Sequence, residues 1–316
     1  RSHSKETHIV REIRASGRQM DVDRLIRRIG RTDCKLIVLH GDSGVGKSSI
    51  LEAGLEPALK QKSVGGRDVL PVLLRSYVDW VRKFGQCVSE TLVAVKHPAS
   101  SSLDLTERIL EELQKNEERD ILTVLIFDQF EEFFFANPEP DKRREFYSFL
   151  HDSLDLPFVK VILSLREDYL HYLLECDRFA DLEVINKDIL TKNIRFPLGN
   201  FTPEDAKSVI RSLTERSQFY LEEELIERLA QDLAKGSDEV RPIELQIVGS
   251  QMQAKNISTL EKYRPKEELV EARKQLLKMA GAQTTEATFN SDLLRKEFDK
   301  NNDGRIDAEE QVALRA

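Results

Sequence analysis

The chain has 316 residues, which is enough for one large α/β domain together with one or two small ones. Hydrophobic residues make up 40% of it and charged residues 33%, a balance that indicates a soluble protein with a real core. The formal net charge of −8 argues against a non-specific nucleic-acid surface or an anionic-membrane surface, and no apolar run is long enough to cross a bilayer.

The three cysteines, Cys34, Cys87 and Cys176, are far apart and share no motif, as is usual for thiols in a reducing compartment. We therefore expect a cytoplasmic protein with no membrane partner and no nucleic-acid partner, although a local basic patch stays open. Residues 1–35 are highly charged, but their apolar spacing predicts a helix from about Asp21. We interpret residues 1–35 as a helical entry segment to the core.

Residues 36–39 are aliphatic without alternation, which is the pattern of a strand buried on both faces. Directly after them, residues 41–48 fit G-x-x-x-x-G-K-[ST], and residues 48–59 favour a helix. This context predicts a phosphate-binding loop rather than a chance match on a surface loop, because glycines and a helix N-terminus direct N–H groups at phosphates. We expect Lys47 to reach the β- and γ-phosphates and the Ser48 hydroxyl to bind Mg²⁺. The predicted nucleotide-binding residues of this loop are Gly41, Asp42, Ser43, Gly44, Val45, Gly46, Lys47, Ser48 and Ser49.

A second strand is predicted over residues 68–76, where Pro71 indicates an edge strand or a strand start. Helices are expected over residues 81–95 and 105–113, the second amphipathic and covering the sheet.

Residues 121–128 form the next predicted strand, which is apolar throughout and ends in Asp128. In proteins with such a phosphate loop this strand is expected beside the loop's strand, with its terminal carboxylate holding Mg²⁺ through water. The alternative interpretation is a strand followed by an ordinary helix cap.

Hydrolysis of a nucleotide needs a carboxylate near the γ-phosphate to orient and polarise the attacking water. Glu131 and Glu132 are the acids within reach of Asp128 along the chain, and the sequence does not rank them. Either one fits a solvated charge on a helix turn equally well. Gln129 precedes them as a polar contact at best.

A helix over residues 141–152 and a buried strand over 158–165 follow. Polar residues at the carboxyl end of a central strand face the ligand crevice, so Ser164 and Arg166 are candidates to sense the γ-phosphate. A salt bridge between Arg166 and Asp168 is the competing interpretation. Residues 194–198 predict a further short strand, which completes a core over residues 36–200.

From Thr202 onward the pattern is helical, beginning with a capped start. We interpret residues 201–255 as a helical lid domain, in which Pro242 opens the last helix, and residues 256–288 as a helical linker.

Four motifs in order, GDSGVGKSSILEAGLEPAL, DQFEEFF, SLREDYLHYL and RPIELQ, resemble those of the STAND class of signalling P-loop ATPases, in the branch common in bacterial sensor and conflict proteins. The likeness covers about residues 17–255. It implies a nucleotide-binding α/β core with a helical domain, and an ATP-driven change from a resting form to an oligomer that activates an attached effector. The resemblance also implies that Arg18 lies near the nucleotide base and that Pro242 packs on adenine.

Residues 299–310 match the twelve-position calcium loop of an EF-hand, with Gly304 at its sharp turn. We assign residues 289–316 to a single EF-hand. A lone hand is expected to bind calcium weakly, and a partner hand beyond residue 316 or from another copy of the chain is the alternative. The predicted Ca²⁺ ligands are Asp299, Asn301, Asp303, Arg305 through its carbonyl, Asp307 through water and Glu310.

The sequence therefore predicts an α/β P-loop NTPase core, with a parallel sheet flanked by helices, followed by an all-helical lid domain and a single EF-hand. The leading hypothesis is a slow ATPase that uses ATP and Mg²⁺, with Lys47, Asp128, Glu131, Glu132 and Arg166 as candidate catalytic residues. Its nucleotide state would control self-association and an effector, with Ca²⁺ as a second input. Two rivals are a nucleotide-locked assembly module without turnover and a calcium sensor centred on the EF-hand.

Overall fold

The structure is a computed structural model of the chain, and it describes residues 17–99, 101–175, 191–217, 219–235 and 238–265. The chain divides into two compact units between Gly199 and Asn200. No helix in these described ranges combines the length and the apolarity that a membrane span requires.

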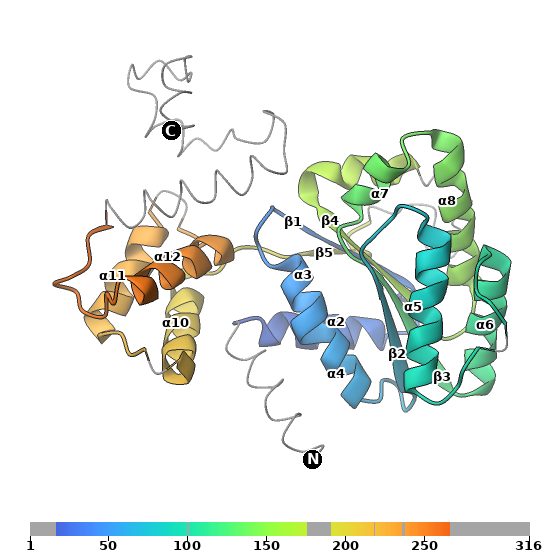
Figure 1. The fold of residues 1–316 in the computed structure, drawn as a ribbon, viewed down its shortest axis with the longest axis horizontal. Helices are drawn as coiled ribbons and strands as arrows, with labels where there is room; N and C mark the ends of the chain where they lie inside the picture. Colours follow the sequence, from blue (N-terminus) through green and yellow to red (C-terminus); the bar gives the residue numbers. More distant parts are fainter. Residues whose placement is uncertain (1–16, 100, 176–190, 218, 236–237, 266–316) are drawn as a thin grey trace. The chain divides into compact units, whose positions relative to one another are not determined.

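The first unit is built on a five-stranded sheet in which every neighbouring pair of strands is parallel (Figure 1). The order across the sheet is β2-β3-β4-β1-β5. The strands are β1 (Leu36–Gly41), β2 (Asp68–Leu74), β3 (Ile121–Phe127), β4 (Val159–Arg166) and β5 (Arg195–Pro197). The α/β fold with a parallel sheet and flanking helices is thus confirmed.

The expected neighbourhood of β1 and β3 is wrong, because β4 lies between them. Leu36 of β1 is aligned with Val161 of β4, whose other side aligns with Leu125 of β3. The three strands are all buried along their length, so hydrophobicity does not rank them from centre to edge. The crossover from β3 to β4 decides the order, and the carboxyl ends of all three strands still meet at one edge of the sheet.

The edge prediction for the second strand is confirmed. In the described sheet β2 pairs with β3 alone, and Pro71 is aligned with Val124 in that pair. A proline has no N–H to donate, so it fits a strand with one free side.

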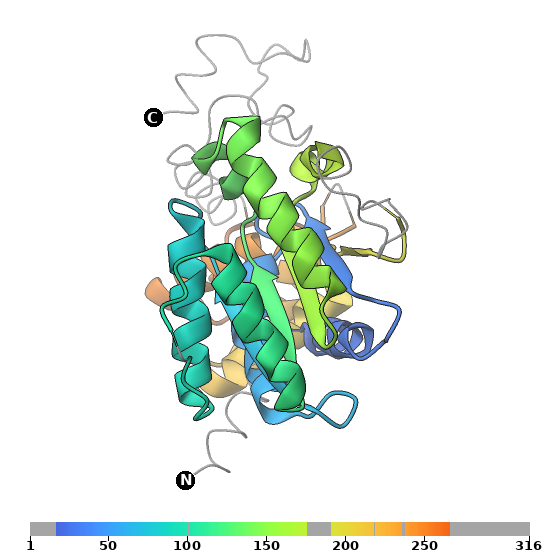
Figure 2. The ribbon, with the colours of Figure 1, turned by 90° about the vertical axis from the view of Figure 1, so that its right-hand side faces the viewer.

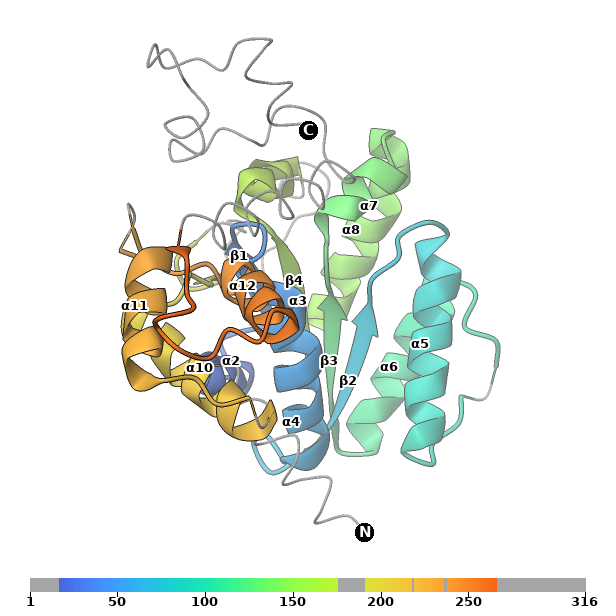
Figure 3. The same cartoon turned by 60° about the vertical axis from the view of Figure 1, so that its left-hand side comes forward.

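Helices cover both faces of the sheet, because successive strand residues point to opposite faces. One face packs against α5 (Trp80–Ala94), α6 (Thr106–Glu118) and α8 (Pro140–Asp155), which Figure 2 turns toward the viewer. The other face packs against α2 (Gln19–Ile29) and the helix that follows the phosphate loop, as Figure 3 shows.

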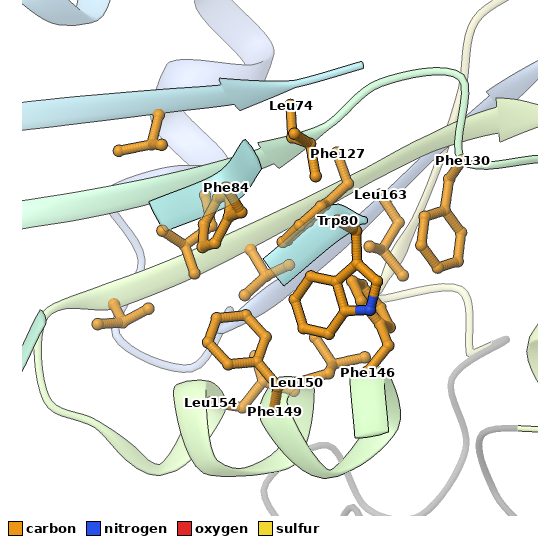
Figure 4. Packing of buried hydrophobic residues seen from close by; sticks show 14 of the residues in the cluster. Leu74, Trp80, Phe84, Phe127, Phe130, Phe146, Phe149, Leu150, Leu154 and Leu163 are labelled. Atoms are coloured by element: carbon orange, nitrogen blue, oxygen red, sulfur yellow. The ribbon is translucent and has the colours of Figure 1, made fainter. Parts of the chain in front are cut away.

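The core under α5 and α8 is aromatic (Figure 4). The ring centroids of Trp80 and Phe146 are 5.1 Å apart, and those of Phe84 and Phe127 are 5.2 Å apart. Such pairs add edge-to-face attraction to the burial of large apolar area, and they hold β3 firmly against the helices.

The helix predicted over residues 48–59 runs from α3 (Lys47–Ser49) through η1 (Ile50–Leu55) to α4 (Glu56–Gln61). Its middle part, η1, is a π-helix, a form that is often found at functional sites. A Cβ at Gly54 would lie 2.7 Å from Cγ2 of Val22, so the glycine allows η1 to approach α2 closely.

The second unit is helical in its described residues, as the sequence predicts. It contains α10 (Pro203–Ser217), α11 (Glu223–Leu233) and α12 (Pro242–Ala254), which share an apolar core of their own. The Thr202 hydroxyl accepts the Asp205 N–H at 3.1 Å, and the Asp205 carboxylate accepts the Thr202 N–H at 3.2 Å. This reciprocal pair is a capping box that starts α10.

Two short helices of the first unit follow strands directly. They are α7 (Glu131–Ala136), which follows β3, and the 3₁₀-helix η2 (Glu167–Glu175), which follows β4. Both begin at the carboxyl edge of the sheet, where the phosphate loop also begins.

Candidate functional site

The phosphate loop leaves β1 at Gly41 and enters the helix at Lys47. A Cβ at Gly41 would lie 2.3 Å from the carbonyl oxygen of Leu198, so a larger residue would collide with the backbone. Gly46 has a φ of 94°, a left-handed conformation that favours glycine. These two glycines explain why the loop can turn sharply at the end of a buried strand.

Among the described residues, no acceptor pairs with the backbone N–H groups of residues 43–46. The Val45 carbonyl, in contrast, accepts a hydrogen bond from Arg18 at 2.8 Å. The loop therefore presents a row of free donors beside a helix N-terminus, and this arrangement suits a phosphate group.

The side chain of Lys47 folds back onto the start of this loop. Its Nζ donates to the carbonyl oxygens of Gly41 at 2.7 Å and of Asp42 at 2.8 Å. Burial lowers the pKa of Lys47, while the charges of Glu131 and Asp128 oppose that shift. The ammonium group is thus within electrostatic reach of both predicted catalytic carboxylates.

Asp128 follows β3 and is completely buried. Its Oδ1 accepts a hydrogen bond from the Ser164 hydroxyl at 3.0 Å, and its Oδ2 accepts one from Arg75 Nε at 3.3 Å. Tyr77 donates its hydroxyl to the Asp128 carbonyl oxygen at 2.7 Å. Asp128 is therefore held at its side chain and at its main chain.

The structure places Ser164 against Asp128, and the γ-phosphate sensing expected of Ser164 stays a prediction. Its side chain is fully buried, and its carbonyl accepts the Phe130 N–H at 2.7 Å. Between Asp128 and Phe130, Gln129 takes a φ of 53°, so the chain turns sharply before α7. These bonds orient the turn that carries the two candidate glutamates.

The structure distinguishes the two glutamates that the sequence does not rank. Glu131 is 9% exposed, and its Oε2 accepts the backbone N–H of Arg166 at 3.3 Å, whereas Glu132 is exposed. Burial raises the pKa of Glu131, and the nearby charge of Lys47 opposes the shift. Glu131 is the one that shares the site with Lys47.

Arg166, at the end of β4, forms the ion pair that was the competing interpretation. Its guanidinium binds Asp168 through contacts of 3.1 Å and 2.5 Å, and it lies 5.2 Å from the ring centroid of Tyr169. Its charge still affects the pKa of Lys47 and of Glu131. A phosphate-sensing role for Arg166 stays a prediction.

Arg18 is buried, and its Nη2 bonds the carbonyl oxygens of Val45 at 2.8 Å and of Gly199 at 2.7 Å. It thereby connects the phosphate loop to the last residue of the first unit. Pro242 belongs to the second unit, in the first turn of α12. The adenine contacts expected of Arg18 and Pro242 stay predictions.

The Mg²⁺ contacts expected of Ser48 and Asp128 stay predictions. In the described part of the chain, no group of three or more His, Cys, Asp and Glu side chains could hold a metal ion by itself. Mg²⁺ is commonly held by one or two carboxylates together with substrate phosphates, so a site on Asp128 would not require such a group. The predicted Ca²⁺ ligands, from Asp299 to Glu310, lie outside the described residues, so the EF-hand stays a prediction.

Sequence reasoning missed two residues of the site, Arg75 and Tyr77. Arg75 lies inside the strand predicted over residues 68–76, but the observed β2 ends at Leu74, so both residues come just after its carboxyl end. Parallel strands present their carboxyl ends at one edge. That rule, applied to the end of β2 as it was to β3 and β4, would have indicated Arg75.

A parallel sheet, a glycine-rich loop with its lysine, and an acid at the end of another strand of the same sheet define the class of P-loop NTPases. The profile of the family Novel STAND NTPase 1 matches residues 14–289. The chain therefore belongs to this family, and it is a nucleotide-binding P-loop NTPase.

Several solved structures share the fold. The ORC2 protein of Aeropyrum pernix in its ADP form is 13% identical, with a TM-score of 0.56 over 94% of this chain and 84% of that one. The Walker-type ATPase PABY2304 of Pyrococcus abyssi is 15% identical, with a TM-score of 0.52 over 84% and 74% of the two chains. The ORC1 protein of Aeropyrum pernix in complex with DNA is 14% identical, with a TM-score of 0.51 over 94% and 76%. No curated protein matches by sequence.

Proposed function

We propose that the protein is a STAND-type switch that binds ATP with Mg²⁺, hydrolyses it slowly and changes its self-association with its nucleotide state. Membership of the Novel STAND NTPase 1 family supports the nucleotide chemistry. The choice of ATP, the slow turnover and the switch are the parts that we propose.

One observation carries the proposal: Lys47, Asp128 and Glu131 converge at the carboxyl edge of the sheet, with Glu131 almost buried. A carboxylate whose pKa is raised by burial is a stronger proton acceptor than one in water. This is the property that a general base for water attack needs.

In the proposed reaction, Glu131 accepts a proton from water as the water oxygen bonds to the γ-phosphorus of ATP. The bond from that phosphorus to the β,γ-bridging oxygen breaks, and ADP leaves with the electron pair. Lys47 and the free N–H groups of the loop stabilise the charge on the phosphate oxygens. Ser48 and Asp128 would hold Mg²⁺, which supplies further compensation of that charge.

The enzyme reading is tested by ATP binding and phosphate release for the purified protein and for Lys47→Ala. We expect the substitution to abolish turnover, because it removes the ammonium group that bonds the carbonyls of Gly41 and Asp42 at the start of the loop. Equal binding and equal turnover in the two proteins would refute the proposal.

The rival in which nucleotide is a locked structural cofactor is decided by the same preparation. ADP that co-purifies, is retained and is never turned over would favour that rival. Steady release of phosphate, lost in Lys47→Ala, favours the ATPase.

The switch itself is tested by the molar mass of the protein with ATP, with ADP and without nucleotide. The bonds of Arg18 to Val45 and Gly199 connect the phosphate loop to the last residue of the first unit, so a change in the loop can reach the end of that unit. We expect a larger assembly in one nucleotide state, as a platform for an effector. A mass that is independent of nucleotide would contradict the switch.

Calcium is proposed as a second input through residues 299–310, on the motif alone. Calorimetry with Ca²⁺ compares the protein with Glu310→Gln, which removes the bidentate ligand. An isotherm unaltered by the substitution would remove calcium, and the calcium-sensor rival with it.

A nucleic-acid partner was not expected from the net charge, but the ORC1 structure is a complex with DNA. A mobility-shift measurement with duplex DNA, with and without ATP, addresses this point. We propose no nucleic-acid binding, and a salt-dependent shift at low protein concentration would contradict that.

A further inference from the structure

Arg75 lies between two carboxylates at the edge of the nucleotide site. Its Nε donates to Asp128 Oδ2 at 3.3 Å, and its Nη2 donates to Glu52 Oε2 at 2.9 Å. It comes directly after β2, while Glu52 lies in η1, the π-helical segment that follows the phosphate loop. One guanidinium thus joins three parts of the site.

The two carboxylates differ in their exposure. The side chain of Asp128 is 1% exposed, whereas that of Glu52 is 57% exposed and that of Arg75 is 36% exposed. A buried carboxylate needs a compensating charge or hydrogen bonds, and Glu52 can be compensated by water. In the described part of the chain, Arg75 is the cation that forms an ion pair with Asp128.

The pKa of Arg75 is raised, first of all by its hydrogen bond to Glu52, with the Asp128 charge contributing less. The contact with Glu52 is also the shorter of the two. Arg75 thus has a second carboxylate partner besides Asp128, at the shorter distance, that can keep the guanidinium when Asp128 binds a cation.

We propose that Arg75 is an internal counter-ion that competes with a divalent cation for Asp128, and that Glu52 holds the guanidinium when the cation arrives. The inference rests on the proposed function, because the cation concerned is the one bound with nucleotide. Arg75 is thus a positioning residue that sets how tightly the metal is held.

The physical reason is that two cations beside one buried carboxylate repel each other with little screening. Removing Arg75 leaves the Asp128 charge to the metal alone, so metal affinity rises. Removing the charge of Glu52 leaves Arg75 with Asp128 as its sole ionic partner, so metal affinity falls. A merely structural role for Arg75 would not give opposite signs in the two variants.

The test uses the full chain with saturating ADP and measures Mn²⁺ binding from the loss of the free-ion EPR signal. Relative to the unsubstituted protein, we expect about three- to tenfold tighter Mn²⁺ binding in Arg75→Gln and weaker binding in Glu52→Gln. Arg75→Lys keeps the charge and is expected near the unsubstituted value. Asp128→Asn defines the binding that does not depend on this carboxylate.

The matched control is Arg82→Gln, which removes one positive charge from an exposed pair with Asp79 on the next helix. Its Mn²⁺ affinity should equal that of the unsubstituted protein. Thermal unfolding of every variant shows whether it is folded, and Glu52→Gln tests the inference if Arg75→Gln does not fold.

Equal or weaker Mn²⁺ binding in Arg75→Gln overturns the inference, and so does tighter binding in Glu52→Gln. If ADP and Mn²⁺ bind, Asp128→Asn weakens the metal and Arg75→Gln changes nothing, the inference alone fails. If the unsubstituted protein does not bind ADP at all, the proposed function fails first.

Discussion

Lys47 and Lys160 lie at opposite ends of the same sheet and make the same local contacts. Lys47 follows the carboxyl end of β1, and its Nζ donates to two main-chain carbonyls of the phosphate loop. Lys160 is near the amino end of β4, and its Nζ donates to the carbonyls of Arg31 and Cys34, both at 2.6 Å. Burial lowers the pKa of both lysines.

Their surroundings separate them. The charges that raise the pKa of Lys47 come from Glu131, Asp128 and Asp42, whereas for Lys160 the only carboxylate among the causes is Asp33. The loop around Lys47 is exposed over residues 42–44, while the Lys160–Cys34 bond is buried. Lys160 is therefore a structural contact that fixes the amino end of the sheet. Lys47, with the same kind of bonds, can exchange its carbonyl partners for phosphate oxygens.

The largest expected effect is the difference in ATP turnover between Lys47→Met and Lys160→Met. Lys47→Met should lower ATP turnover by about 10³-fold or more, because the charge that faces the phosphates is lost. Lys160→Met should leave turnover of the folded protein within about threefold, since no reacting group is near it. Phosphate release under saturating ATP compares the two variants. Equal losses of turnover would show that the two lysines do not differ in function.

The second comparison is within the carboxyl end. Glu131→Gln should lower kcat by about 10²-fold or more with little change in ATP affinity, because a proton acceptor is lost. Glu132→Gln, which changes an exposed neighbour in the same way, should stay within about twofold. A larger loss of kcat in Glu132→Gln would show that Glu132, and not Glu131, is the general base.

Stability should respond in the reverse order. Lys160→Met leaves two carbonyls without their donor, one of them buried, and should cost about 1–3 kcal/mol of unfolding free energy. The carbonyls that Lys47 bonds can turn to water, so Lys47→Met should cost less. Urea unfolding measures both free energies. A greater loss of unfolding free energy in Lys47→Met would contradict the structural role of Lys160 and the exchangeable role of Lys47.

The smallest effect expected is the pH dependence that Glu131 adds to stability. Its folded-state pKa is raised above the ordinary 4.5, so above that pH the native protein holds more protons than the unfolded chain. Stability then falls as pH rises through the window above 4.5, and the penalty persists at neutral pH. Glu131→Gln should therefore unfold at a higher temperature than the unsubstituted protein at pH 7.

That advantage should vanish at about pH 4 and below, where the carboxyl is protonated in both states. Thermal unfolding at the two pH values checks the sign. A Glu131→Gln protein that is less stable at pH 7 would show that the ionised carboxylate stabilises the fold. The pKa of Glu131 would then not be raised by folding.

The phosphate loop could be found in the sequence because its information is local. The fixed spacing of Gly41, Gly46 and Lys47 after a buried strand dictates a turn whose N–H groups are free. Asp128 was also visible, since an acid ends an apolar run. The capping pair of Thr202 and Asp205 is of the same kind, with both partners within one helical turn.

The strand order and the partners of Asp128 were not visible in this way. Arg75 and Asp128 are 53 positions apart, and Ser164 is 36 positions beyond Asp128. Only the placement of β3 between β2 and β4 brings these side chains to one point. The expectation that β3 lies beside β1 was wrong for the same reason, because three equally buried strands carry no mark of their order.

The amino-acid sequence alone therefore determined the class of protein, the phosphate loop and the carboxylate at the end of β3. Each depends on residues close together in the chain, whose types restrict the local backbone. Tertiary structure alone decided that Glu131 rather than Glu132 faces Lys47, and that Arg75 and Ser164 hold Asp128. Those contacts depend on which strands pack side by side and which helix face is buried, and both are set by the core as a whole.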